Sequence, residues 1–217
     1  MTTLEEQVAL STRVIHVFDR EGDIAEVFDQ VNALTHTGVV VRAAHNRCLE
    51  NDYQHLWEKL ETRPIQAYYP VELSETKTRK ARSANLAVRF CRVQLRSPAR
   101  LGTDSQLWVY ADYSSEVDCP EGEEPVSWML LTSEPVTTVE QAKTILRCYS
   151  YRWRVEEYHK ILKSGCKVEQ YRLGAGSMKT LLGFLSVIAV DLLRLTYWQR
   201  TEPDKPAEDL LNNAIAG

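Results

Sequence analysis

Two short apolar runs separated by one amphipathic stretch constrain the fold of this chain most. The runs "RVIHVFD" (13–19) and "GVVVRA" (38–43) are rich in β-branched residues, and "IAEVFDQVNAL" (24–34) between them has the apolar spacing of a helix. A strand, a helix and a second strand with short connections form a βαβ unit of an α/β sheet. Because two parallel strands cannot bury both faces of a sheet, we expect part of that sheet to be missing on the N-terminal side.

The middle of the chain has a different character. Strand-like segments, separated by loops rich in Pro, Gly, Ser and acidic residues, lie at 65–73, 85–95, 106–115 and 126–133. We interpret this stretch as a mainly antiparallel β region with one short helix near "YQHLWEKLE" (53–61).

The last third of the chain is predicted to be helical. We expect helices over 139–172, 177–199 and, weakly, 207–214, with the break at "GAG" (174–176). The predicted organisation is a βαβ portion, a β insertion, a helical portion and a tail, with boundaries at 1–43, 44–137, 138–200 and 201–217.

Composition points to a chain without a membrane span or a disulfide framework. The five cysteines are scattered and never form Cys-x-x-Cys, which favours a reducing cytoplasm over disulfides or a zinc site. The apolar segment "LLGFLSVIAVDLLRL" (181–195) is too short to cross a membrane and contains Asp191 and Arg194, so we interpret it as a buried helix.

The charge distribution is more informative than the net charge. The formal net charge of -4 and the pI near 5.8 give no indication of nucleic-acid binding. Between residues 139 and 172, however, eight basic residues stand against four acidic ones. A basic patch on an acidic protein indicates a local recognition surface.

One face of the predicted helix over 139–172 gathers functional side chains. At about 100° per residue, five side chains fall within an arc of about 80°: Tyr149, Arg152, Glu156, Lys160 and Lys163. A working face for binding is one interpretation. The alternative is an ordinary charged helix surface stabilised by pairs such as Glu156 with Lys160.

A second acidic site lies at the end of the first apolar run. Asp19 follows a predicted strand, where α/β sheets present functional groups. Asp23, with Glu26 three residues on, is predicted to cap the following helix in a capping box. A strand-end aspartate and a helical glutamate flanked by cations suit Mg²⁺ or Mn²⁺ beside phosphate oxygens.

With these residues in view, the sequence resembles bacterial insertion-sequence transposases of the DDE type, in the group with the Y-x2-R-x3-E-x6-K signature that includes the Tn-five transposase. The signature residues correspond to Tyr149, Arg152, Glu156 and Lys163. The similarity extends over about 12–200 and includes "VFDREGDI" (17–24), "VVVRAAHNR" (39–47) and "PVSWMLLTSEPV" (125–136).

The resemblance implies a fold and a reaction. It implies an RNase H-like α/β domain with a β insertion, a bacterial cytoplasmic location, and Mg²⁺- or Mn²⁺-dependent cleavage and joining of double-stranded DNA at transposon ends. Asp19 and Glu156 would be the second and third metal-binding carboxylates.

The resemblance also implies DNA contacts for several side chains. Phosphates of the transposon end would be contacted by Arg42, Tyr149, Arg152, Lys160 and Lys163. Trp128 would stack on a flipped base, although without the resemblance a core indole is the preferred interpretation. A further basic run contacts the DNA backbone or forms a charged loop: Lys77, Arg79, Lys80 and Arg82.

One departure from the family pattern concerns activity. The family's first catalytic aspartate precedes the segment of Asp19, and no aspartate lies before Asp19 here. We therefore expect an N-terminally truncated chain that binds metal weakly, is inactive alone and has a bare apolar edge at 14–18. The alternative is a non-catalytic DNA-binding remnant that inhibits a full-length transposase; a homodimer is also compatible with the sequence.

Overall fold

The computed structural model describes residues 1, 12–50, 52–73, 80–102, 105–204 and 206. The chain forms two compact units, Met1–Ser150 and Tyr151–Gly217. Each unit is described by itself. The predicted terminal helix at 207–214 lies outside the described residues.

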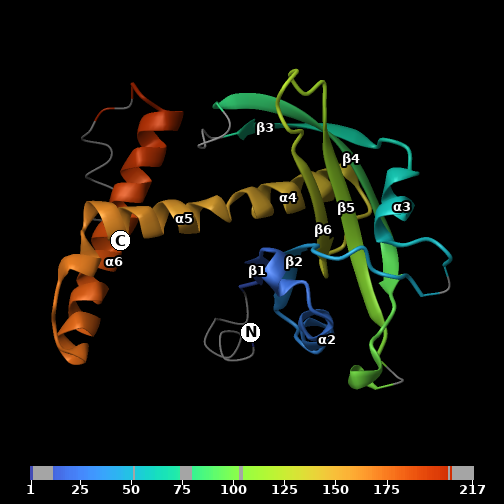
Figure 1. Ribbon diagram of the computed structural model, residues 1–217, viewed down its shortest axis with the longest axis horizontal. Coiled ribbons are helices and arrows are strands. Elements are labelled where there is room, and N and C mark those ends of the chain that lie inside the picture. The colour runs from blue at the N-terminus through green and yellow to red at the C-terminus, as the bar shows by residue number, and fades with distance from the viewer. Residues whose placement is uncertain (2–11, 51, 74–79, 103–104, 205, 207–217) are drawn as a thin grey trace. The chain divides into compact units, whose positions relative to one another are not determined.

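A six-stranded mixed sheet forms the centre of the first unit (Figure 1). The order is β1-β2-β6-β5-β4-β3, with β1 and β2 parallel and every other pair antiparallel. The strands are β1 (Val14–Phe18), β2 (Thr37–Arg42), β3 (Ala67–Leu73), β4 (Arg82–Leu95), β5 (Leu107–Val117) and β6 (Ser127–Thr132). The predicted βαβ unit and all four predicted strands of the insertion are confirmed, and so is the mixed α/β class.

The βαβ strands and the strands of the insertion belong to one sheet. Strand β2 pairs with β1 on one side and with β6 on the other, where Val41 lies opposite Leu131. The insertion therefore supplies β2 with its second neighbour.

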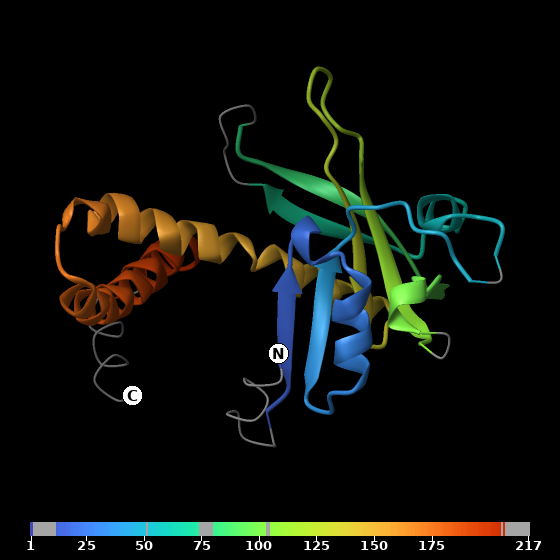
Figure 2. The same ribbon diagram turned by 60° about the horizontal axis from the view of Figure 1, so that its bottom comes forward.

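Helices cover both faces of this sheet. On one face, α2 (Ala25–Asn32) and α3 (Leu56–Glu61) contribute Phe28, Leu56 and Leu60 to a core with the strands, and α2 lies beside β2 (Figure 2). On the other face, α4 (Val139–Ser150) packs through side chains including Leu146. Apolar residues at helical spacing on one side of each helix produce this three-layer arrangement.

Strand β1 is an edge strand. It stands at the end of the strand order, and all five of its residues are only half-buried. Within the described ranges no strand pairs with its outer edge. Apolar edge strands of this kind favour intermolecular pairing.

The second unit is helical, but the predicted single helix over 139–172 is wrong. After α4, residues 151 and 152 form a turn, followed by α5 (Trp153–Lys160), a π-helical turn η3 (Ile161–Gly165) and a 3₁₀ turn η4 (Val168–Gln170). Hydrogen bonds from the Arg154 and Val155 amides reach back only three residues, to the carbonyls of 151 and 152. The tighter 3₁₀ bonding and the π turn change the angle between successive side chains. A single helical wheel at about 100° per residue therefore does not describe this segment.

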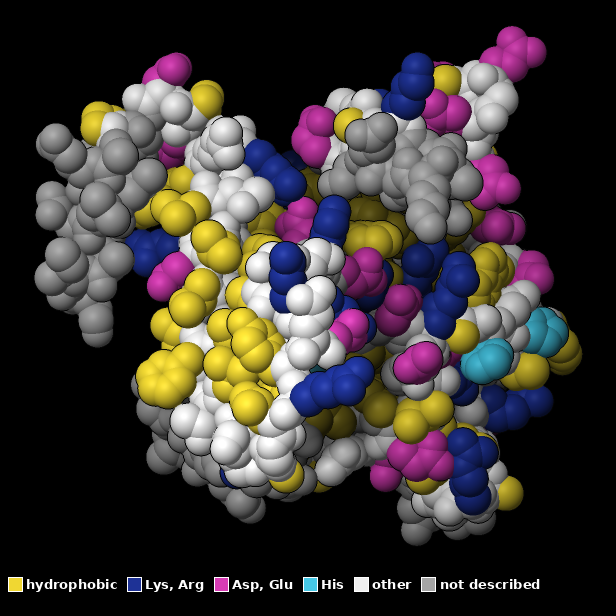
Figure 3. Space-filling model, turned by 60° about the vertical axis from the view of Figure 1, so that its left-hand side comes forward, with side chains coloured by type: hydrophobic (Ala, Val, Ile, Leu, Met, Phe, Trp, Pro, Cys, Tyr) yellow, Lys and Arg dark blue, Asp and Glu magenta, His cyan; other side chains and the backbone are white. Residues whose placement is uncertain are grey.

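Helix α6 (Ala175–Thr201) confirms the predicted helix over 177–199, with Gly174 as its N-cap at the predicted break. Its predicted burial is wrong, because Ala189 is its one buried residue among those described. Apolar residues lie all around α6, and within the helical unit only α5 and η3 pack against it substantially, so hydrophobic side chains remain at the surface (Figure 3). Across the described ranges, no helix combines the length and the apolar character needed to cross a membrane.

Candidate functional site

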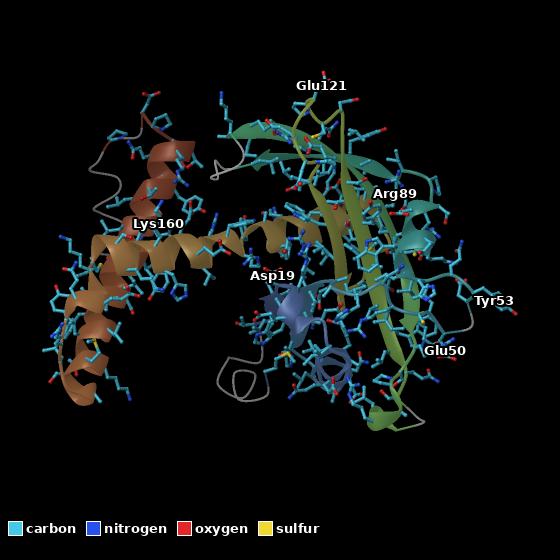
Figure 4. All side chains as sticks on the ribbon, in the orientation of Figure 1. Asp19, Glu50, Tyr53, Arg89, Glu121 and Lys160 are labelled. Atoms are coloured by element: carbon cyan, nitrogen blue, oxygen red, sulfur yellow. The ribbon has the colours of Figure 1, made fainter. Side chains whose placement is uncertain are left out.

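Asp19 is held at the carboxyl end of β1 (Figure 4). Its Oδ1 accepts a hydrogen bond from the amide of Arg20 at 2.8 Å, which caps the 3₁₀ turn η1 (Arg20–Gly22). A Cβ added at Gly22 would lie 2.4 Å from the Cβ of Phe18, so this turn packs on the strand only with glycine at position 22. The local sequence thus fixes the backbone that presents the Asp19 carboxylate.

Asp23 has a structural role different from the predicted one. Ile24 is the N-cap of α2, and no side chain caps it, so the predicted capping box is wrong. The buried Asp23 carboxylate instead accepts hydrogen bonds from the amides of Ala44 and His45 and from Arg47 Nε at 2.8 Å. The donors all lie in the segment after β2, so the Asp23 carboxylate joins that segment to the turn after β1.

Tyr149 lies in the core of the first unit and is not on an exposed helix face. Its side chain is 1% exposed, and its ring packs edge-on against that of Trp128 with 5.4 Å between centroids. Its hydroxyl donates to Asp19 Oδ1 at 3.5 Å, near the limit of a hydrogen bond. Helix α4 uses this side to cover the sheet, so Tyr149 does not share an exposed face with Lys160 and Lys163, and its predicted contact with DNA stays a prediction.

Trp128 is buried in the same core, with 7% of its surface exposed. Its indole therefore occupies the position expected for a core residue. The predicted stacking on a base would require the contact with Tyr149 to open, and it stays a prediction.

The other basic candidates of the first unit differ in their partners. Arg42 ends β2 and donates from Nη2 to the carbonyl of Ser127 at 3.2 Å. Arg82 forms a two-point ion pair with Glu116, whose side chain is almost fully buried, and a second pair with Glu123. Arg82 is thus neutralised within the protein and does not support the predicted backbone contact.

The rest of that basic run is divided. Lys80 is exposed, whereas Lys77 and Arg79 lie outside the described residues.

Glu156 and Glu157 have separate roles in the helical unit. Glu156 is exposed and pairs with Arg152 Nη1 at 2.9 Å, one turn earlier, and not with Lys160 as the alternative interpretation expected. Glu157 accepts from Tyr197 Oη at 2.5 Å and from Arg200 Nη1 at 2.9 Å, which joins α5 to α6. Burial raises the pKa of Glu157, whereas the bonds from Tyr197 and Arg200 and the charges of Arg200 and Arg154 lower it, and the net result is a lowered pKa.

Lys160 and Lys163 are both exposed in the helical unit. Lys163 lies on the π turn and forms a long surface ion pair with Glu169 at 3.4 Å. Such a pair contributes little to stability and can be exchanged for another anion. Both amines are therefore accessible to an anionic ligand.

A buried carboxyl that the sequence analysis missed lies on β5. Asp112 is fully buried; its Oδ1 accepts from Ser114 Oγ at 2.7 Å, and its Oδ2 has no partner among the described residues. Burial raises the pKa of this carboxyl to about 7, although the bond from Ser114 opposes the rise. Alternation along a strand predicts that Asp112 and Ser114 share one face of the sheet. Nothing in the sequence indicated that this face is buried at Asp112.

The donor chemistry of Asp19 and Glu156 fits a hard divalent cation. Both offer carboxylate oxygens, which Mg²⁺ and Mn²⁺ prefer. Within the described part of the chain, no group of three or more His, Cys, Asp or Glu side chains is arranged to hold a metal ion. The two carboxylates belong to different units.

Comparison with known protein families places most of this chain in one of them. Residues 21–192 match the model of the transposase DDE domain. The matched range begins just after Asp19 and includes every other candidate site residue: Arg42, Trp128, Tyr149, Arg152, Glu156, Lys160 and Lys163.

Proposed function

Because the chain belongs to the transposase DDE domain family, we propose that it is catalytic-domain sequence of an RNase H-like transposase from the group with the Y-x2-R-x3-E-x6-K signature. Its substrate would be double-stranded DNA at transposon ends. The complete signature within the matched range is the observation that supports this proposal most strongly: Tyr149, Arg152, Glu156 and Lys163.

Asp19 and Glu156 would hold Mg²⁺, which when bound supplies charge stabilisation for phosphodiester cleavage. Tyr149 would keep the Asp19 carboxylate in one orientation, because its hydroxyl donates to Oδ1 while its ring is fixed in the core. Arg152 pairs with Glu156 in the structure. This ion pair would keep other cationic side chains from binding the Glu156 carboxylate before DNA and metal bind.

Cations of the helical unit would bind DNA phosphates. Lys160 and Lys163 have accessible amines, and Arg152 supplies a planar guanidinium suited to two phosphate oxygens. A further copy of this chain, or a full-length transposase, would be a compatible partner on the same DNA.

The test of DNA binding is a salt series. A fluorescent duplex is titrated with the chain, and Arg152→Ala combined with Lys163→Ala should weaken binding and reduce the slope of log K against log salt by about 0.9 for each phosphate that the variant no longer neutralises. The double variant Arg172→Ala with Lys179→Ala removes the same charge from the same unit as a control. Equal effects of both variants would refute a specific role for the signature cations; no binding by the unaltered chain would refute the function.

We further propose that the chain alone does not cleave DNA. Residues 1–18 contain no aspartate, so the sequence before Asp19 offers no equivalent of the family's first catalytic aspartate. Nicking of a supercoiled plasmid in Mn²⁺ is the assay, and we expect none. Nicking that disappears with Glu156→Ala would show that the chain is active by itself, whereas DNA binding without nicking would favour the inhibitor role.

A further inference from the structure

Strand β1 presents hydrogen-bonding groups along its outer edge. The amide of Val14 donates to the carbonyl of His36 at 2.8 Å, so the polar backbone groups of Val14 face β2. Because these groups alternate in direction along a strand, those of Ile15 and Val17 point away from β2. Among the residues that the structure describes, no strand pairs with this side. The amides and carbonyls of Ile15 and Val17 can therefore pair with an added strand.

A groove beside this edge has room for an apolar side chain. It has a volume of about 320 Å³ and lies between Ile15 and the N-terminal half of α4, with Pro135 and Ile145 in its lining. The side chains of Ile15 and Val17 both pack on the α4 side of the sheet. A residue directly opposite Ile15 on an added strand would point to the same side. The groove thus favours an apolar residue at that position.

The sequence of the β1 region is complementary to itself in the antiparallel direction. Two copies that pair antiparallel about residue 16 place apolar residues opposite apolar ones and a cation opposite an anion at each end. The pairs are Arg13 with Asp19, Val14 with Phe18, Ile15 with Val17, and His16 with its own copy. Opposite charges directly across a strand pair stabilise it, and like charges destabilise it. A centre at residue 15 or 17 would instead put Arg13 opposite Val17 or Asp19 opposite Ile15, so the match selects one register.

Both charged residues are held in place at the two ends of β1. Arg13 Nε donates to Glu134 Oε2 at 2.8 Å and its Nη1 to the carbonyl of Thr35 at 3.0 Å, while the side chain remains 46% exposed. Asp19 Oδ1 accepts from the amide of Arg20 at 2.8 Å. Side chains that are already ordered lose less entropy when they form a further ion pair.

We propose that two copies of this chain associate through the outer edges of their β1 strands, antiparallel and about a two-fold axis at His16. Ile15 of each copy would exchange both backbone hydrogen bonds with Val17 of the other, whose side chain would lie at the groove beside α4. The two six-stranded sheets would then form one continuous sheet. Such an interface uses the same surface on both copies, as two-fold symmetry requires. It involves neither DNA nor metal and does not rest on the proposed function.

The first experiment locates the two-fold axis by disulfide cross-linking, in a Cys48→Ser background that removes the exposed native thiol. His16→Cys should give a covalent dimer under mild oxidation, because residue 16 would face its own copy with about 4.5 Å between Cα atoms. Val14→Cys is the control on the same side of the same strand, since its copy would lie roughly 13 Å away. Equal cross-linking of the two variants, or none by a folded His16→Cys variant, would overturn the proposal.

The second experiment measures the dimer dissociation constant by sedimentation velocity at low ionic strength. Arg13→Asp should raise this constant by about tenfold, because two attractive pairs become two repulsive ones. Adding Asp19→Arg to the same chain reverses both pairs and should restore most of the affinity, although the bonds from Arg13 to Glu134 stay lost. Circular dichroism checks that both variants are folded. An unaltered chain that stays monomeric, or a double variant that binds no more tightly than Arg13→Asp, would overturn the interface.

Discussion

The buried carboxyl of Asp112 should make the stability of the sheet depend on pH. Its pKa is raised by burial from 3.8 to about 7 in the folded chain. Well below pH 3.8 the group is protonated in both states and does not make stability depend on pH. As pH rises from there, the unfolded chain releases a proton that the folded chain keeps, so the free energy of unfolding falls until about pH 7.

The magnitude follows from the same two values. A difference of about 3 between the folded and unfolded pKa corresponds to about 4 kcal/mol at about 1.4 kcal/mol per tenfold change in the equilibrium. A small domain is stable by about 5–15 kcal/mol, so this loss is a large fraction of the total. Asp112→Asn removes the ionisation, keeps a carbonyl oxygen for Ser114 Oγ, and should abolish the loss.

Urea denaturation at pH 4 and at pH 8, followed by circular dichroism of the β-sheet, measures the effect. At pH 4 the Asn variant should be no more stable than the unaltered chain, because its amide hydrogens lack an acceptor. At pH 8 it should have gained about 4 kcal/mol relative to the unaltered chain. Asp29→Asn is the matched control, since the exposed Asp29 accepts the same bond from Ser105 Oγ at 2.7 Å. A pH dependence that Asp112→Asn leaves unchanged would refute the reasoning.

Four further results are expected. Tyr149→Phe should cost about 1 kcal/mol of unfolding free energy through the lost hydroxyl bond, whereas Tyr149→Ala should cost about 3–5 kcal/mol, both measured in urea. Gly22→Ala should cost about 1–3 kcal/mol because the added methyl meets Phe18, with unchanged stability as the contradicting result. Glu157→Gln should lower the melting temperature, while Glu156→Gln should change stability by less than about 0.5 kcal/mol. The open edge of β1 should make the purified chain associate with rising concentration in sedimentation velocity, and a monomer at all concentrations would contradict this.

The strands were predictable because their signals are local. Apolar runs bounded by turn residues located β1 to β6, and the parallel pairing followed from the short helical connection. The pairing of β2 with β6 was not predictable in this way, because the two strands are separated by the whole insertion. Their contact depends on complementary apolar surfaces, which one-dimensional periodicity does not encode.

The candidate site shows the same difference between local and distant information. The position of Asp19 at a strand end was expected from its neighbours, but the roles of Asp23 and Tyr149 depend on partners far along the chain. The helical wheel assumed one regular helix, and the turn at 151 and 152 breaks that assumption. Asp112 was missed because the burial of a carboxyl depends on segments that are distant along the chain.

The pairing of β2 with β6 also bears on how this protein can be shortened. A deletion that removed the insertion and rejoined its ends would strip β2 of one neighbour and leave the strand that carries Asp19 in a ribbon of two strands. Such a ribbon is marginally stable in water. The insertion is separate from the βαβ portion in the sequence, but in the sheet its strand β6 stabilises β2 and, through β2, β1.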